Sequence, residues 1–264
     1  MPSLASLPRA QVIALLSLPL ASASLLATYF YTRPLPLTTP REITTTRTLS
    51  PSCTAKSTSK SLSIVNPYDH VSDPDSISIN LSGSEIRELT DEEILARILK
   101  GFFGGWSFLP ERTYLSALGL MGRSFIPVGF SGVPDSGPTI LSPNDLSMKK
   151  LPEKYSKLFH GNFMILDMHI RDHDSTSSFT YAQRISGSFV DVTFGDDRRG
   201  FAGFHRLEVL HFEDSEKGGV TLCYSSIACN PTVNKLPLTG WLFTFHRWYG
   251  MCLFRDGVEM VLMS

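Results

Sequence analysis

Alternating apolar and polar positions mark the stretch from Phe201 to Leu262 as the part around which the chain is organised. Residues 201–212 and 220–229 alternate with the period of strands that bury one face, and a turn-rich segment separates them. Residues 238–262 follow, with apolar and aromatic side chains at helical spacing. This order predicts a sheet wrapped around a C-terminal helix, an arrangement that can enclose a cavity.

Three more strand patterns precede this stretch, at residues 163–170, 180–185 and 189–194. The connections between the predicted strands are short and rich in turn residues, whereas a parallel pair needs a crossover of about a dozen residues or more. We therefore predict an α+β fold in which a curved antiparallel sheet packs around a long C-terminal helix.

A first helix is predicted to begin after Thr90. Thr90 and Glu93 have the spacing of a capping box, and acidic residues in the first turn suit the helix dipole. Apolar residues then recur at helical spacing until Gly104 and Gly105. Pro110 opens a second, shorter helix, and the Gly- and Pro-rich residues 122–150 are predicted to form a long loop of the kind that often serves as a lid or rim.

The N-terminal part carries an apolar run from residue 10 to residue 31 that contains no charge. About 22 helical residues span the hydrocarbon thickness of a bilayer, so residues 1–33 are predicted to be a single-pass membrane anchor, in the endomembrane system. The alternative is secretion after cleavage of a signal peptide, because Ala21, Ser22 and Ala23 form a small-x-small pattern. The anchor's orientation stays open, and with it the glycosylation of Asn80, which lies in a sequon.

Residues 34–84 are rich in Ser, Thr and Pro and hold little that could be buried. Such a segment is predicted to be a disordered tether between the anchor and a folded domain that spans residues 85–264. Cys53, inside the tether, is expected to be a solvent-exposed thiol.

Composition narrows the possible functions. Among 264 residues the net charge is −1, which leaves no basic surplus for phosphates, so we expect no nucleic-acid partner. The four cysteines are too scattered for a metal site or a disulfide framework and are expected to be free thiols. No metal-ligand spacing and no phosphate-binding loop is present, so neither a metal nor a cofactor is expected.

The predicted C-terminal helix carries more aromatic surface on its wide apolar face than packing requires. Large rings against a curved sheet are suited to lining a pocket for an apolar small molecule. The candidate ligand-binding residues are Trp241, Phe245, Trp248 and Tyr249.

Three residues are candidates for catalysis. His205 shares a strand face with apolar residues, so it is either a core residue or a group that exchanges a proton with a ligand. Asp191, on a strand that could lie next to it, is its candidate orienting partner. Asp256 projects from the last helix towards the apolar face and is either half of a structural ion pair or a catalytic acid.

Three runs carry a resemblance to a known group of proteins: Phe-Ala-Gly-Phe-His-Arg-Leu-Glu-Val from Phe201, Cys-Asn-Pro-Thr-Val-Asn-Lys from Cys229, and Phe-His-Arg-Trp-Tyr-Gly-Met-Cys-Leu-Phe-Arg-Asp-Gly-Val from Phe245. They resemble a group of uncharacterised fungal proteins with an N-terminal anchor. More distantly, residues 90–264 are similar to the bacterial and plant family of unknown function in the START and birch-pollen-allergen superfamily of helix-grip folds. That resemblance implies a curved sheet that holds a long C-terminal helix around a hydrophobic cavity.

Two functions follow as hypotheses. The first is a membrane-anchored protein that binds a small hydrophobic ligand or lipid in its cavity. The alternative is a cofactor-free cyclase or isomerase of secondary metabolism that uses His205 with Asp191 or Asp256. A fold shared by carriers, receptors and cyclases does not choose between them.

Overall fold

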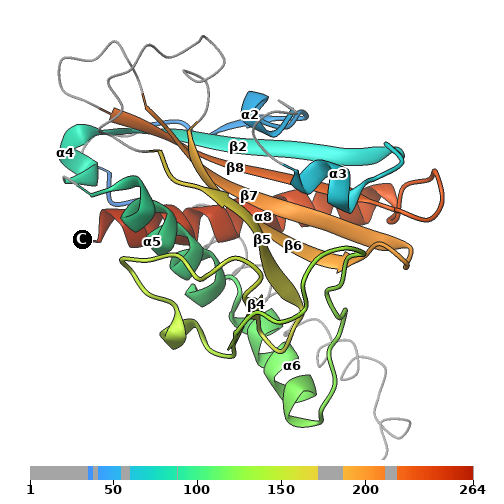
Figure 1. Ribbon diagram of the computed structural model, residues 1–264. Helices are drawn as coiled ribbons and strands as arrows, with labels where there is room; N and C mark the ends of the chain where they lie inside the picture. Colours follow the sequence, from blue (N-terminus) through green and yellow to red (C-terminus); the bar gives the residue numbers. More distant parts are fainter. Residues whose placement is uncertain are drawn as a thin grey trace, which may run out of the picture. The chain divides into compact units, whose positions relative to one another are not determined.

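One mixed sheet and a long C-terminal helix form the frame of the protein (Figure 1). The computed structural model describes residues 35–37, 41–54, 60–87, 89–171, 187–211 and 219–263, and all elements below lie in the unit Pro36–Ser264. The strands are β1 (Thr44–Thr46), β2 (Ser72–Ser82), β3 (Thr139–Ile140), β4 (Lys157–Leu158), β5 (Phe163–His169), β6 (Ser188–Asp196), β7 (Phe201–His211) and β8 (Gly219–Cys229). The helices are α2 (Pro51–Thr54), α3 (Ser61–Val65), α4 (Gly83–Ile86), α5 (Asp91–Gly104), α6 (Leu109–Leu120), the 3-10 helix η2 (Pro143–Asp145) and α8 (Gly240–Leu262).

The strand order is β1-β2-β8-β7-β6-β5-β4-β3. All neighbouring strands in this order pair antiparallel, as the turn-rich connections predict, except the last two, β4 and β3, which are parallel. The wholly antiparallel sheet expected from the sequence is therefore wrong at this edge. Residues 141–156 connect β3 to β4, and a connection of this length allows the chain to return in the same direction.

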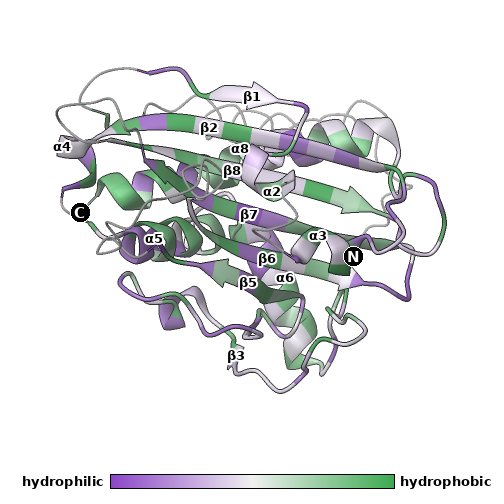
Figure 2. Cartoon of the chain, turned by 45° about the horizontal axis from the view of Figure 1, so that its top comes forward, coloured by the Kyte–Doolittle hydropathy of each residue, from purple (hydrophilic) through white to green (hydrophobic). Residues whose placement is uncertain are grey.

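The two faces of the sheet carry different helices. In Figure 1, α3 lies in front of the central strands and α8 lies behind them, and Figure 2 shows α2 on the same side of the sheet as α3. Consecutive residues of β7 show the same division, because the His205 ring stacks on His246 of α8 whereas the Arg206 guanidinium donates to Ser52 of α2. We call these the α8 face and the α2/α3 face. A hydrophobic cluster on the α2/α3 face includes Cys53, Phe204 and Ile227.

Helix α5 packs directly on α8. A Cβ at Gly101 would lie 2.5 Å from the Asp256 carbonyl oxygen and 2.8 Å from Gly257 Cα. The pair Gly101 and Gly257 therefore allows the two backbones to approach closely, and α5 fixes the position of α8 over the sheet.

Several sequence predictions are confirmed. Helix α5 begins after Thr90 with the predicted capping box, in which Glu93 N donates to Thr90 Oγ1 and Thr90 N donates to Glu93 Oε2. Strands β5 to β8 and helices α6 and α8 begin and end within a few residues of the predicted bounds. The four cysteines are free and buried, so the expectation of an exposed Cys53 is wrong.

The segment 72–82 differs from the expected tether, because it forms β2 and pairs along its whole length with β8. Apolar residues at positions 77, 79 and 81 alternate with polar ones, and Figure 2 shows this alternation along β2. The aspartates and the proline at the start of β2 obscure a strand pattern that is short but regular. The elements β1, α2 and α3 also lie within residues 34–84, so the folded region begins well before residue 85.

Two predictions fall on residues that the structure does not describe: the anchor at residues 10–31 and the strand at residues 180–185. Among the described residues, no helix combines the length and the hydropathy needed to cross a bilayer.

Candidate functional site

A cavity of about 330 Å³ lies on the α8 face of the sheet. Its walls come from α5, α6, the strands β5 to β8, α8 and the start of the loop that follows α6. The lining residues are Phe102, Phe103, Phe108, Glu111, Leu115, Phe125, Ile126, Asn162, Phe163, Phe194, Phe201, His205, Tyr224, Phe245, His246, Tyr249, Gly250 and Leu253.

Helix α8 presents one side to the cavity. Phe245, Tyr249 and Leu253 follow one another at intervals of four residues, which places them in a row along the helix. Gly250 lies beside this row, where an added Cβ would come within 3.1 Å of the Tyr224 hydroxyl oxygen. The absence of a side chain at Gly250 therefore lets α8 lie close to β8.

A group of phenylalanines forms much of the opposite wall. Phe103 contacts Phe108 and Phe163 at ring-centroid distances of 5.2 and 5.1 Å, in edge-to-face geometry. Phe102 lies 5.7 Å from the His205 ring and 5.5 Å from the Tyr224 ring. These separations are typical of packed aromatic pairs, so this wall is closely packed and largely apolar.

His205 faces the cavity from β7. Its Nδ1 shares a hydrogen bond of 3.0 Å with the Tyr224 hydroxyl, and its ring stacks on His246 at 5.8 Å. Burial lowers the pKa of His205 well below its usual range, and the neighbouring His246 lowers it further. Burial also lowers the pKa of His246, whose Nε2 lies 3.3 Å from the Ser226 hydroxyl. Both imidazoles are therefore neutral at physiological pH.

A second polar pair lies where α6 meets α8. The Tyr249 hydroxyl donates to Glu111 Oε2 at 2.9 Å. Burial raises the pKa of Glu111, while the bond from Tyr249 lowers it. Burial and the adjacent Glu111 together raise the pKa of Tyr249, so this phenol stays protonated.

The predicted ligand-binding residues divide into two groups. Phe245 and Tyr249 line the cavity as expected, whereas Trp241 and Trp248 do not. Trp241 is 70% exposed in the first turn of α8, and Trp248 packs beside Phe245 with a centroid separation of 5.9 Å. The helical spacing identified the apolar side of α8 but not the part of it that borders the cavity.

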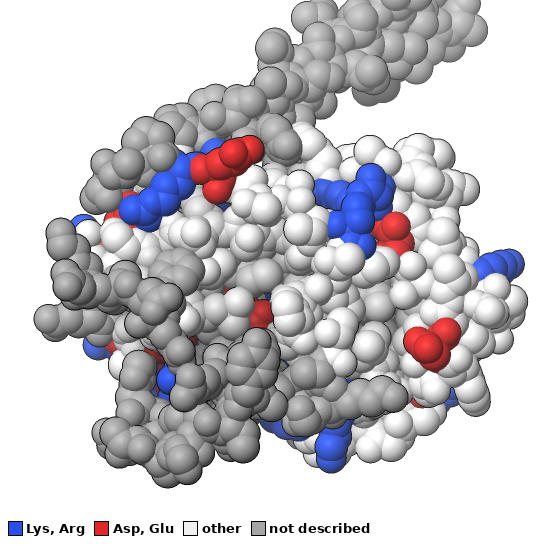
Figure 3. Space-filling view, turned by 90° about the horizontal axis from the view of Figure 1, so that it is seen from above, with Lys and Arg blue, Asp and Glu red and all other residues white. Residues whose placement is uncertain are grey.

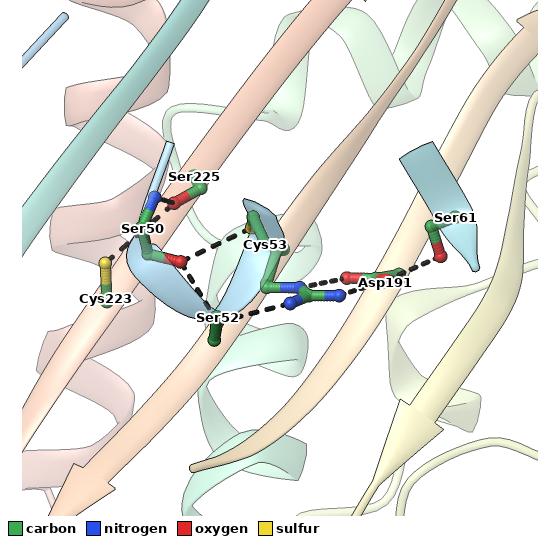
Figure 4. Close-up of polar contacts among 8 residues, drawn as sticks. Ser50, Ser52, Cys53, Ser61, Asp191, Cys223 and Ser225 are labelled. Carbon is green, nitrogen blue, oxygen red and sulfur yellow. Dashed lines mark hydrogen bonds and ion pairs between the residues drawn. The ribbon is translucent and has the colours of Figure 1, made fainter. Parts of the chain in front are cut away.

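Of the predicted catalytic residues, only His205 reaches the cavity. Asp191 lies on the strand next to His205, as expected, but on the α2/α3 face, because its partner in register is Arg206 while His205 pairs with Val192. Its carboxylate receives bonds of 2.7 and 2.8 Å from Arg206 Nε and Nη2, and a bond from Ser61 (Figure 4). Asp191 cannot orient His205 through the sheet.

Asp256 is buried but lies outside the cavity. Its Oδ2 accepts a hydrogen bond of 2.8 Å from the Ser107 backbone N–H, and an added Cβ at Gly105 would collide with its carboxylate. Asp256 therefore stabilises the chain between α5 and α6. This position favours a structural role for Asp256 over the role of a catalytic acid.

Sequence analysis missed four polar residues of the cavity: Glu111, Asn162, Tyr224 and His246. Glu111 stands in the first turn of a short helix, where an acidic residue is expected for the helix dipole alone. Tyr224 lies within a predicted strand and His246 within the predicted C-terminal helix. Only Tyr224 had a signal in the sequence, because the alternation along its strand places it on the same face of the sheet as His205.

Among the described residues, no group of three or more His, Cys, Asp or Glu side chains is arranged to hold a metal ion. Comparisons with family models, with curated proteins and with solved structures found no match to this chain. The fold resemblance therefore stays a prediction, and the functional argument depends on the geometry of the cavity.

Proposed function

We propose that this chain is a membrane-anchored protein that binds a small hydrophobic ligand in the cavity between the sheet, α5, α6 and α8. The observation that carries the proposal is the cavity itself, whose lining is mostly aromatic and aliphatic with a few polar groups. This composition is typical of sites that enclose apolar small molecules.

The volume favours a compact ligand. Ligand pockets usually measure roughly 300–1,000 Å³, and about 330 Å³ is at the lower end of that range. Burying roughly 200 Å² of apolar ligand surface contributes about 5 kcal/mol of hydrophobic free energy, from which the cost of immobilising the ligand is subtracted. A ring system or a short chain fits this size better than a two-chain lipid does.

The exposed lining residues indicate where a ligand would enter. Phe125 and Phe245 line the cavity and are 57% and 54% exposed, whereas Leu115 is 1% exposed. The entrance therefore lies between the loop that follows α6 and the first half of α8. The predicted lid or rim at residues 122–150 is consistent with this position.

The helix-grip resemblance supports the same proposal at the level of the fold. A long C-terminal helix crosses one face of the sheet (Figure 1). Residues of this helix and of the sheet line the same cavity. We therefore include in the proposal that the sheet is curved and that the chain is a member of the helix-grip superfamily.

Membrane attachment is proposed from the apolar run at residues 10–31. Alkaline extraction of membranes tests it, because an anchored chain stays in the pellet. Secretion after signal cleavage would instead release a shortened chain, which N-terminal sequencing detects. Asn80 is exposed on β2, and a mobility shift after glycosidase treatment would assign the folded part to the lumenal side.

A nucleic-acid partner is not part of the proposal. Among the described residues on the face seen in Figure 3, Lys and Arg side chains are scattered and form no continuous basic surface for a phosphate backbone.

The ligand is tested by mass spectrometry of small molecules that copurify with the full chain in lipid nanodiscs. Leu115→Trp places an indole in the cavity, and Leu253→Trp blocks it from α8. Leu120→Trp, on the same helix as Leu115 but 88% exposed, is the matched control. We expect a stoichiometric ligand with the wild type and Leu120→Trp and its loss from both blocked variants. Identical extracts from all four proteins would refute the proposal.

A second candidate is the cofactor-free cyclase or isomerase. The neutral His205 ring in the cavity, joined to Tyr224 and stacked on His246, favours it. The same extracts separate the candidates with His205→Ala. A binding protein retains the wild-type ligand, whereas an enzyme accumulates an unconverted molecule of different structure.

A further inference from the structure

The described lining of the cavity contains an acidic residue but no strongly basic one. Among the described lining residues, Glu111 is the one carboxylate, and no Lys or Arg is present. Arg112, its neighbour in sequence, donates from Nη1 to the Phe103 carbonyl oxygen at 2.8 Å and does not line the cavity. A ligand anion would find no fixed positive charge in this wall.

Most other polar groups of the wall already have internal partners. Asn162 accepts from the backbone N–H groups of Phe125 and Ile126 and donates to the Phe159 carbonyl. His205 bonds Tyr224 through Nδ1 and His246 bonds Ser226 through Nε2, so among the described residues the second nitrogen of each ring has no hydrogen bond. The two neutral rings therefore keep one uncharged hydrogen-bonding position each but offer no charge to a ligand.

Glu111 differs from these groups because it is the one carboxyl group among the described lining residues, and a carboxylate carries a negative charge. One carboxylate oxygen accepts from Tyr249, and the other has no hydrogen bond among the described residues. A carboxylate accepts up to about four hydrogen bonds, so Glu111 keeps free acceptor capacity next to the apolar volume. The Tyr249 bond fixes the orientation of the carboxylate, because Tyr249 is itself held on α8.

We propose that the ligand of this cavity, if it binds one as proposed above, is a compact apolar molecule with a protonated amine or a hydroxyl group that donates a hydrogen bond to Glu111, and that the cavity rejects carboxylates. An ammonium group forms a charge-assisted bond with Glu111, and a hydroxyl forms an ordinary one. A carboxylate would be repelled by Glu111 and would lose its hydration without compensation.

Three naphthalene probes of nearly equal shape test the inference: 2-naphthylmethylamine, 2-naphthylmethanol and 2-naphthoate. Their fluorescence reports binding to the full chain in nanodiscs, and binding to Leu115→Trp measures partition into the lipid. We expect the amine to bind most tightly, the alcohol next, and the naphthoate at least about tenfold more weakly than the amine.

Glu111→Gln provides the matched variant, since its amide oxygen still accepts from Tyr249. We expect this change to weaken the amine at least about tenfold and the alcohol by less than about threefold. If the variant does not fold, as judged by near-ultraviolet circular dichroism, the three probes on the wild type still decide the order.

The outcomes separate this inference from the proposed function. Naphthoate that binds the wild type as tightly as the amine would overturn the inference and leave a hydrophobic binding site. An amine whose affinity is unchanged in folded Glu111→Gln would also overturn it. Saturable binding of none of the three probes above the Leu115→Trp background would overturn the proposed function as well.

Discussion

Replacing Asp191 by Asn removes the negative charge from a buried ion pair on the α2/α3 face. The side chains of Asp191 and Arg206 are both 0% exposed, and two bonds of 2.7 and 2.8 Å join them. Asn offers one acceptor oxygen, and its amide group would place further donors against the guanidinium. The variant therefore leaves Arg206 as a buried charge without its bidentate partner.

The expected cost follows from the burial of the pair. Breaking a buried ion pair by removing one partner typically costs about 3–5 kcal/mol, which is a large part of the roughly 5–15 kcal/mol that stabilises a domain. Glu208 lies close enough to affect the pKa of Arg206, and burial raises its own pKa. Because Glu208 remains as a nearby carboxyl group, we expect a value near 3 kcal/mol for Asp191→Asn.

Urea unfolding followed by tryptophan fluorescence measures the loss. Asp167→Asn is the matched control, because Asp167 lies directly opposite Asp191 in register on β5. Its partner Lys154 lies 2.8 Å away but is 43% exposed, so this change should cost less than about 1 kcal/mol. Equal and small losses for the two variants, with unchanged urea dependence, would refute the buried-pair argument.

Three further outcomes are expected. Burial raises the pKa of Asp75 from 3.8 to about 7, so between these pH values the folded state binds more protons than the unfolded state, and the free energy of unfolding falls as pH rises. Urea unfolding at pH 4 to 8 should therefore show a decrease of at most about 4 kcal/mol that is absent from Asp75→Asn. Gly101→Ala should lower the free energy of unfolding by about 1–3 kcal/mol, because the added methyl group meets α8, whereas Gly240→Ala has open space around it and should not destabilise the fold. Thermal unfolding compares the two variants, and equal losses of stability would contradict the close approach of α5 and α8. Burial raises the pKa of Cys53, Cys223 and Cys229 to about 11, 12 and 11, respectively. A thiol reagent at pH 8 should therefore label these cysteines only after denaturation, and rapid labelling of the native chain would contradict their burial.

The parts of the fold that sequence analysis predicted are those with a strong period. The capping box of Thr90 and Glu93 and the alternation in β7 depend on local chemistry, so α5 and the orientation of His205 were predicted correctly. Strand β2 was missed because its acidic start and its proline outweigh three alternating apolar residues. Its position depends on eleven paired residues of β8, which no local pattern reveals.

The candidate site was harder to predict, for a reason of geometry. Alternation within one strand does not give the register between strands, and a shift of one residue moves a side chain to the other face. Asp191 was therefore assigned to His205, although it lies with Arg206 on the α2/α3 face. Glu111 and Tyr249 are 138 positions apart, so their contact exists only in the folded chain.

The most direct test of the central claim is equilibrium binding of the apolar fluorophore N-phenyl-1-naphthylamine to the full chain in nanodiscs. Wild type and Leu120→Trp should show the same saturable site above the lipid background, and Leu115→Trp should bind at least about tenfold more weakly because its indole fills the cavity. Equal binding by a folded Leu115→Trp would contradict the claim that this cavity is the binding site.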